Sequence, residues 1–371
     1  MDNQCIQFQH STKNKLFNTK KRPLQYEECY KHKKIKSQEI NYKSDVDIVT
    51  LFKLELERIL INSNVLNTTI TDILPYGSRI SGLNITDSDV DFNISYVSKT
   101  PAKKVIKSFA NKLRQSQVFI KVFPLICAKI PIIKCTHKNT GINCDISFNN
   151  ISAVHNSHLL NHILSIDCRI KPVLMKLKIW AKNIGLINTN GFSSYSFYWL
   201  GLFIMQVLGL LPAIRDLQKS VPEILVDQWN CAFSKKLQEY IINKQETLSE
   251  SEILNFFYKY YSNFDFNKFV ISPYTGYPLL KKDFENIEQL PDELWRYKQF
   301  HKENKECQKL LFLGSCQFKM YTQDPFQHNV NITARVTPKI FEKFINACVE
   351  LKTIQKAKNN TSLDLTLTSQ R

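Results

Sequence analysis

The sequence predicts an α+β protein, in which a mixed β-sheet with helices is followed by a mostly helical second part. Short apolar stretches with strand-like alternation crowd the segment between residues 70 and 148, with helical patterns before and among them. From Ser152 onward the apolar residues recur at helical spacing instead. The length of 371 residues agrees with two domains.

The first part, residues 45–150, is expected to begin with a helix that precedes the sheet. Apolar residues three or four apart predict helices at residues 45–61 and 102–114, and Pro101 is placed to open the second one. Apolar runs and alternation predict the strands at residues 70–74, 90–96, 118–124, 130–136 and 141–148.

The second part, residues 151–353, is expected to consist mainly of helices. They are predicted at residues 156–164, 167–183, 196–210, 249–261 and 338–353. Residues 215–250 are typical of a loop with an irregular helix, and residues 267–283 of a hairpin around Thr275-Gly276. The polar residues 354–371 are expected to be a disordered tail.

The charge balance favours a polyanionic partner. Fifty Lys and Arg residues stand against 33 Asp and Glu residues, which gives a net charge of +17 and a pI of about 9.3. Such a chain suits nucleic acid or an anionic membrane surface. Residues 1–44 carry two basic runs, and we expect a disordered arm that contacts a nucleic-acid backbone or serves as a nuclear import signal.

Composition also excludes several classes of protein. No run of 18 apolar residues occurs, so we expect no membrane-spanning helix and no membrane partner. The ten cysteines form no Cys-x-x-Cys pair, and the first residues lack an apolar signal core. We therefore expect reduced thiols, no structural zinc and a cytoplasmic location, with the nucleus and the mitochondrion as alternatives.

Residues 75–92 carry the main chemical signal. They begin at a strand end, turn on Gly77-Ser78 and close on Asp89 and Asp91. Because side chains alternate along a strand, both carboxylates point one way while their neighbours point to the core. Two such carboxylates repel each other unless a cation lies between them, and hard oxygen ligands favour Mg²⁺ or Mn²⁺. The turn offers N–H groups and a hydroxyl to a phosphate. A solvated acidic loop is the alternative.

Asp145 is the candidate for a third carboxylate. It lies on the polar face of the strand predicted at residues 141–148. On a neighbouring strand it would face Asp89 and Asp91 and complete a three-carboxylate centre, as two-metal phosphoryl transfer requires. An acid at the edge of a strand, without a catalytic role, is the alternative.

A Gly-Ser turn, a spacer and Asp-x-Asp resemble the nucleotidyltransferases of the DNA polymerase β superfamily. Four later segments narrow the resemblance to RNA 3′-terminal nucleotidyltransferases, meaning terminal uridylyltransferases and the related poly(A) polymerases. These segments are residues 177–182 (Leu-Lys-x-Trp-x-Lys), 193–195, 256–266 and 324–336. The resemblance covers residues 45 to 350. It implies a nucleotidyltransferase palm, an active site in the cleft between the two parts, and two Mg²⁺ or Mn²⁺ ions on Asp89, Asp91 and Asp145.

The resemblance also implies which residues hold the nucleotide. The family's paired lysines on the triphosphate correspond to Lys178 and Lys182, which lie four residues apart on one helix face. Its serine at the phosphates and its tyrosine under the base correspond to Ser194 and Tyr195. A solvated lysine pair and a capping serine beside a core tyrosine are the alternatives. The remaining implied contacts are Gly77 and Ser78 at the phosphates, Asn149 and Asn150 at the ribose or RNA end, Ser157 near the nucleotide, and Asp324 and His328 at the base.

The choice of base rests on the loop after Asp324. Family members that prefer UTP commonly carry a histidine six residues after this aspartate, where it crowds out a purine. Here Val330 stands at that position, and His328 reaches the base only if the loop folds two residues tighter. The Asn-Ile-Thr that follows resembles the poly(A) polymerases, whereas residues 144–150 and the compact chain suit a uridylyltransferase. We expect UTP, with ATP as the alternative.

The expected reaction is template-independent transfer of UMP from UTP to an RNA 3′-hydroxyl, with release of pyrophosphate. RNA would be selected by the basic surface, the cleft or a protein adaptor. Two other classes stay open, namely a catalytically inactive RNA-binding pseudoenzyme and a synthase of small signalling nucleotides. The presence of all three acids argues against the first, and the resemblance of residues 256–266 argues against the second.

Overall fold

The computed structural model describes residues 45–61, 66–128, 130–236, 248–304, 311 and 318–368, all within one compact unit, residues 42–371. The expected basic arm, residues 1–44, lies outside the described residues. In the described part of the chain, no helix is long and apolar enough to cross a membrane.

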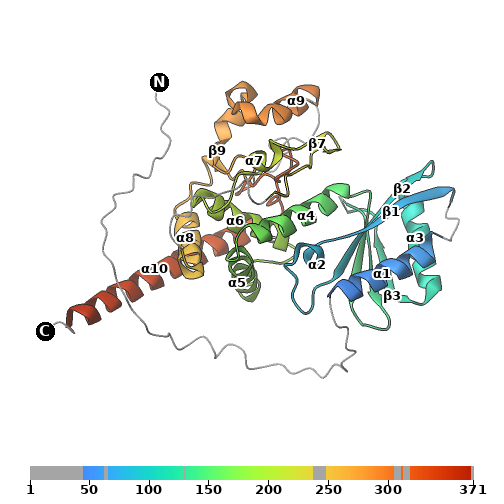
Figure 1. Ribbon diagram of the computed structural model, residues 1–371, viewed down its shortest axis with the longest axis horizontal. Coiled ribbons are helices and arrows are strands. Elements are labelled where there is room, and N and C mark those ends of the chain that lie inside the picture. Colours follow the sequence, from blue (N-terminus) through green and yellow to red (C-terminus); the bar gives the residue numbers. More distant parts are fainter. Residues whose placement is uncertain are drawn as a thin grey trace. The chain divides into compact units, whose positions relative to one another are not determined.

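The first part is a five-stranded mixed sheet with helices (Figure 1). Its elements are α1 (Asp45–Leu60), β1 (Thr68–Tyr76), α2 (Ser78–Ser81), β2 (Val90–Ser98), α3 (Ala102–Ser116), β3 (Phe119–Leu125), β4 (Ile132–His137) and β5 (Asn143–Phe148). The strand order is β1-β2-β5-β4-β3, with β2 and β5 parallel and the other neighbours antiparallel. The expected α+β class and the five expected strands are confirmed.

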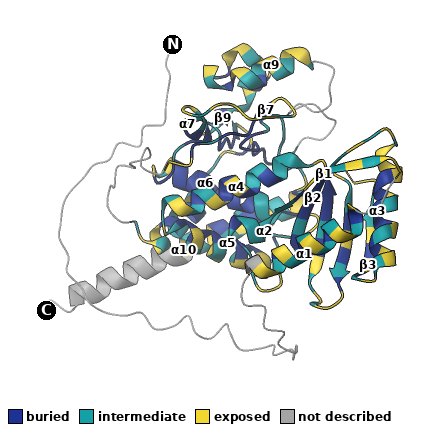
Figure 2. Cartoon of the chain, turned by 45° about the vertical axis from the view of Figure 1, so that its right-hand side comes forward, coloured by how far each residue is buried: buried dark blue, intermediate teal, exposed yellow. Residues whose placement is uncertain are grey.

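One face of this sheet carries the core of the first part. Helices α1 and α3 lie over it (Figure 2), because each turns an apolar stripe toward the strands. Val90 and Phe92 of β2 meet these stripes and are fully buried. The alternation that the sequence predicts for β2 is therefore confirmed. The buried stripe of α3 consists of Val105, Ile106, Phe109, Ala110 and Leu113.

The opposite face carries a row of side chains that crosses all five strands. Paired residues on neighbouring strands point to the same face of a sheet. The pairing therefore sets five residues side by side, in the order Tyr76, Asp91, Asp145, Lys134 and Phe123. We call these five residues the transverse row.

The second part is built from helices around another buried cluster. Its main helices are α4 (Ile151–Ile166), α5 (Ile170–Asn183), α6 (Ser194–Val207), α7 (Ile214–Gln218), α8 (Glu250–Tyr261) and α10 (Pro338–Thr368). Helix α6 is central, since residues 196–206 are all buried. Gly201 lets α5 approach it closely, because a Cβ there would lie 2.7 Å from Leu174 Cδ2. The mostly helical second part is confirmed.

A third, smaller cluster joins the second through Tyr274, which packs against both. Its elements are β6 (Leu225–Val226), β7 (Trp229–Asn230), β8 (Phe269–Val270), β9 (Leu279–Leu280), the 3-10 helices η3 (Lys281–Phe284), η4 (Ile287–Gln289) and η5 (Asp292–Leu294), and α9 (Trp295–Glu303). Strands β8 and β9 form the hairpin expected around Thr275-Gly276.

The C-terminal helix is longer than the sequence pattern predicts. Helix α10 continues past Thr353 to Thr368, so the expected disordered tail is wrong for residues 354–368. This stretch holds neither proline nor glycine. Nothing in it therefore stops a helix that has already started.

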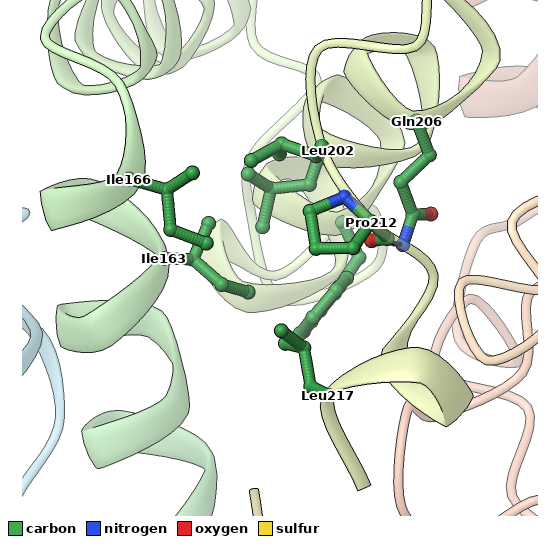
Figure 3. A pocket seen from close by; sticks show the side chains of 8 residues that line it. Ile163, Ile166, Leu202, Gln206, Pro212 and Leu217 are labelled. Carbon is green, nitrogen blue, oxygen red and sulfur yellow. Dashed lines mark hydrogen bonds between the residues drawn. The ribbon is translucent and has the colours of Figure 1, made fainter. Parts of the chain in front are cut away.

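A small apolar hollow lies between α4, α6 and α7 (Figure 3). Ile163 lines it from α4, Leu202 from α6 and Leu217 from α7. None of the site residues predicted from the sequence lines this hollow. The hollow is a packing feature of the second part, and the predicted acids lie elsewhere, on or next to the sheet.

Candidate active site

Gly77 forms the turn between β1 and α2. Its φ of 81° is a backbone conformation that residues with a side chain rarely adopt, and a Cβ there would lie 2.0 Å from Asp91 Oδ2. Its N–H donates to Ser157 Oγ on α4 over 2.8 Å. The turn is therefore held between β2 and α4. Ser78 follows it, and its hydroxyl has no hydrogen-bond partner among the described residues.

Asp91 and Asp145 lie side by side on the parallel strands β2 and β5. Burial, and then the charges of Asp145 and Asp89, raise the pKa of Asp91 to about 7. Burial also raises the pKa of Asp145, while its hydrogen bond with Lys134 works against this rise. Two neighbouring carboxylates that resist ionisation indicate a place that is short of positive charge.

Asp89 lies one residue before β2 and is positioned by the loop that leads to it. Arg79 Nη2 donates to the carbonyl of Ser88 over 2.6 Å, which holds the residue next to Asp89. The charge of Asp89 raises the pKa of both other acids, so it lies within electrostatic reach of each. The fold therefore brings the three expected acids to one region of the open sheet face.

Lys134 is a cation that the structure places at these acids, and Arg79 also lies within electrostatic reach of Asp91. Lys134 lies opposite Asp145 on β4, and the two side chains form an ion pair. Within the described ranges, no three His, Cys, Asp or Glu side chains are grouped closely enough to hold one metal ion. Asp145 would have to exchange Lys134 for an ion. Carboxylate oxygens are the ligands that Mg²⁺ and Mn²⁺ prefer, so the donor atoms of the three acids are of the right type for the expected metals.

The raised pKa of Asp91 would make the binding of Mg²⁺ at this carboxylate depend on pH. A proton on Asp91 competes with the ion, and with a pKa of about 7 this competition weakens binding about tenfold at pH 6 and hardly at pH 8. We therefore expect Mg²⁺ to raise the melting temperature more at pH 8 than at pH 6. Thermal unfolding with Mg²⁺ and with EDTA at both pH values measures the effect, and equal shifts would contradict it.

The same group affects the metal-free protein with the opposite sign. An acid whose folded pKa is raised stabilises the fold below its unfolded pKa, and that contribution is lost as the pH rises through about 7. In EDTA, the melting temperature should therefore fall as the pH rises from the unfolded pKa of 3.8 to about 7. In Asp91→Asn, which cannot titrate, both this fall and the pH dependence of the Mg²⁺ effect should largely disappear.

The two lysines of α5 differ in their surroundings. Lys178 is 3% exposed, and its Nζ donates to the carbonyl of Leu83 over 2.8 Å. Burial, and then the charge of Lys182, lower the pKa of Lys178 to about 8. Lys182 is exposed, and its ammonium group has no hydrogen bond or ion pair with any described residue. Lys178 therefore ties α5 to the first part, while Lys182 remains available to a phosphate.

Helix α6 begins with a capping box made by Ser193 and Ser196, so Ser194 is not the capping residue. The hydroxyl of Ser194 has no hydrogen bond within the described part of the chain. The next residue, Tyr195, donates its hydroxyl proton to Asp324 Oδ2 over 2.8 Å. Burial, and then Asp324, raise the pKa of this phenol, which is thus a fixed donor.

Asp324 organises the loop that follows it. Its Oδ1 accepts the N–H groups of Phe326 and Gln327, and its Oδ2 accepts the hydroxyl of Tyr195. The side chain is buried, and burial raises its pKa. Both carboxylate oxygens are engaged by the protein. Asp324 orients Tyr195, and its expected contact to a base stays a prediction.

His328 is not presented to a nucleotide. It is 3% exposed, and its ring centroid lies 4.0 Å from that of Tyr274 and 5.1 Å from that of Trp229. Burial, and then the charge of Arg296, lower its pKa to about 3, so it is a neutral core residue. This corrects the expected base contact. The physical reason is that an imidazole between two aromatic rings is stabilised by packing and loses its contact with water.

Val330 closes the same loop on its other side. The N–H of Asp324 donates to the carbonyl of Val330 over 3.0 Å. The loop therefore does not fold two residues tighter, and the residue six positions after Asp324 stays partly exposed beside it. An apolar side chain holds the position where the family resemblance places the histidine of UTP-preferring members.

Asn149, Asn150 and Ser157 each form hydrogen bonds within the protein. The side chain of Asn149 accepts the N–H of Tyr96 over 2.9 Å and donates to its carbonyl over 3.4 Å. The N–H of Asn150 donates to Asn93 Oδ1 over 2.6 Å. The hydroxyl of Ser157 accepts the N–H of the Gly-Ser turn. These bonds join β2, β5 and α4, so the three residues serve the frame of the site in this structure.

Two site residues were not found from the sequence. Lys134 had a usable signal, because it stands between two buried residues of β4 and so belongs to the polar face. Tyr198 had none, since it lies in an apolar helix. Its hydroxyl donates to the carbonyl of Leu83 over 3.1 Å, beside the bond from Lys178.

Residues 31–165 match a family model described as "Poly(A) RNA polymerase, mitochondrial-like, central palm domain". The chain is similar to Terminal uridylyltransferase 4 of Homo sapiens, with 30% identity over 217 residues that cover 53% of this chain and 13% of the relative. It is 28% identical over 246 residues to the mitochondrial Poly(A) RNA polymerase of Drosophila melanogaster, covering 56% of this chain and 40% of the relative. The match thus spans less than half of each relative.

Two solved structures share the fold. The crystal structure of mtPAP in complex with ATPγS has a TM-score of 0.69 at 20% identity, covering 86% of this chain and 66% of the other. The Cid1 poly(U) polymerase with MgGTP has a TM-score of 0.63 at 22% identity, covering 83% and 87%. At these identities the likeness establishes the fold. The Gly-Ser turn and the three acids lie within the matched residues 31–165, so the chain is similar there to poly(A) RNA polymerases and terminal uridylyltransferases and shares the fold of mtPAP and Cid1.

Proposed function

We propose that the chain is a template-independent RNA 3′-terminal nucleotidyltransferase. The observation that carries the proposal is the pairing of Asp91 with Asp145 on parallel strands, with Asp89 in electrostatic reach and the Gly-Ser turn against Asp91. The net charge of +17 suits an RNA partner. The reaction is attack of an RNA 3′-hydroxyl on the α-phosphate of a nucleoside triphosphate, with loss of pyrophosphate.

The three acids would hold two Mg²⁺ or Mn²⁺ ions, which supply Lewis acidity toward the attacking hydroxyl and the phosphates when bound. The protein's own donors lie around them. Ser78, Lys182 and Ser194 are uncommitted within the described structure and can donate to the triphosphate. Tyr195, held by Asp324, offers its ring to the base. A protein adaptor for RNA selection belongs to the same proposal.

For the nucleotide we propose ATP, with UTP as the second candidate. A histidine filter against purines has no support in this loop, because His328 is buried between Tyr274 and Trp229 and Val330 is apolar. The Asn-Ile-Thr after it resembles the poly(A) polymerases. This ranking is the reverse of the one that the sequence alone favours. UTP keeps support from residues 144–150 and from the similarity to a terminal uridylyltransferase.

One assay tests the function and the nucleotide together. Full-length protein is incubated with a labelled RNA oligonucleotide, Mg²⁺ and each of the four nucleoside triphosphates in turn, and with ATP and UTP in competition. We expect extension with ATP and none in EDTA. Preferred incorporation of UMP would make the chain a uridylyltransferase. RNA binding without extension would make it a pseudoenzyme, and nucleotide products without RNA would indicate a signalling-nucleotide synthase.

Val330→His tests the base-side loop. A good polar or size filter is worth roughly 1–3 kcal/mol, so the ratio of UMP to AMP incorporation should rise about ten- to hundredfold. The matched control is His328→Ala, which removes the buried ring. It should lower the melting temperature and leave the ratio unchanged. An unchanged ratio in Val330→His would mean that residue 330 does not contact the nucleobase. A changed ratio in His328→Ala would mean that His328 takes part in the choice of base after all.

A further inference from the structure

The transverse row continues past the acids toward the edge of the sheet. Beyond Asp145 it holds Lys134, whose side chain is 48% exposed, and then Phe123, which is 60% exposed. Strand β3 buries Phe119 and Val122 on its other face, so Phe123 is not part of that core. A single exposed apolar residue needs no explanation. Phe123 calls for an explanation, because its exposed ring lies in one row with the proposed catalytic acids and a lysine.

The spacing places Phe123 within reach of a polymer that ends at the acids. Strands β5, β4 and β3 are consecutive, and neighbouring strands lie about 4.8 Å apart. The main chains at Asp145 and Phe123 are therefore about 10 Å apart across the sheet. When the 3′-hydroxyl of an RNA lies at the acids, the last nucleotides of that RNA can bridge this distance.

The local backbone keeps this part of β3 open. The pairing of β3 with β4 shifts its register between Ile120 and Phe123, and Lys121 in this bulge has a φ of 52°. A bulge turns the strand and re-aims its side chains. Lys121 is exposed, and β3 is one of the two edge strands of the sheet. Phe123 thus stands between two exposed lysines, Lys121 on its own strand and Lys134 on the next.

We propose that Phe123 is a stacking platform for a base near the 3′ end of the RNA primer, with Lys134 and Lys121 beside the phosphates. Exposed aromatic rings with flanking basic residues on an open sheet face are how many proteins bind single strands. Stacking accepts every base, because each has a π-face, which suits extension without a template. The proposal rests on the proposed function, which puts the 3′ end at Asp145.

The test compares Phe123→Ala and Phe123→Trp in the full-length protein. Binding of a labelled single-stranded RNA is measured by fluorescence anisotropy in EDTA, and KM is measured separately for RNA and for the nucleotide. We expect Phe123→Ala to weaken RNA binding about tenfold or more and to raise KM for RNA alike. KM for the nucleotide, and kcat at saturating RNA, should stay unchanged. Phe123→Trp should restore RNA binding.

The matched control is Trp295→Ala, which removes another exposed aromatic ring, on α9, that is 50% exposed. Trp295→Ala should leave both the affinity for RNA and the KM for RNA unchanged. If Phe123→Ala binds RNA as tightly as wild type and has the same KM for RNA, the proposed platform is wrong. The same result is expected if Phe123 contacts a protein instead of RNA. If wild type extends RNA and Phe123→Ala does so equally, only the platform fails. If RNA binding depends on Phe123 but nothing is extended, only the proposed function fails.

Discussion

Asp91→Asn and Asp145→Asn are each expected to lower nucleotidyl transfer roughly a thousandfold or more, because several kcal/mol of transition-state stabilisation depend on these ligands. The fold should remain intact. Asp91 is buried, and its raised pKa of about 7 shows that the charged form is disfavoured there. A neutral side chain of the same shape should therefore leave the melting temperature at neutral pH unchanged or higher. Single-turnover extension of labelled RNA and thermal unfolding measure the two effects.

Asp72→Asn is the matched control for these acids. Asp72 lies on β1 of the same sheet, is exposed and is outside the transverse row. Its replacement should leave transfer at the wild-type rate. Transfer within about tenfold of wild type in either Asp91→Asn or Asp145→Asn would contradict the metal assignment, because a lost ligand should cost more than about 1.4 kcal/mol.

Gly77→Ala should lower transfer about a hundredfold and destabilise the protein by about 1–3 kcal/mol. Two costs add at this position. A φ of 81° is strained for alanine, and the new Cβ would lie 2.0 Å from Asp91 Oδ2. The carboxylate has to move away from the face that it shares with Asp145. Extension rates and unfolding curves of the variant measure both consequences.

Gly141→Ala separates these two costs. Gly141 has a φ of 70°, and a Cβ there would meet nothing within 4 Å. This control carries the backbone strain without displacing Asp91. It should lose only the part of the stability that the backbone strain costs, and it should keep its activity. Equal loss of activity in the two variants would mean that Gly77 matters for the backbone alone.

The parts of this protein that the sequence predicts correctly are those with a local cause. Val90 and Phe92 alternate with Asp91, so the polar face of β2 could be assigned without any partner strand. The stripe of α3 likewise follows from spacing within one helix. Lys178 could not be assigned in this way. Its burial depends on the carbonyl of Leu83, which is remote in the sequence.

By itself, the sequence determined the α+β class and the five strands, because alternation and turn residues act over a few positions. Only the tertiary structure decided which residues share a row. Strand register pairs Lys134 with Asp145 and Phe123 with Lys134. The packing of Trp229 and Tyr274 likewise buried His328. Register and burial depend on contacts between segments far apart in the chain, and no local pattern specifies them.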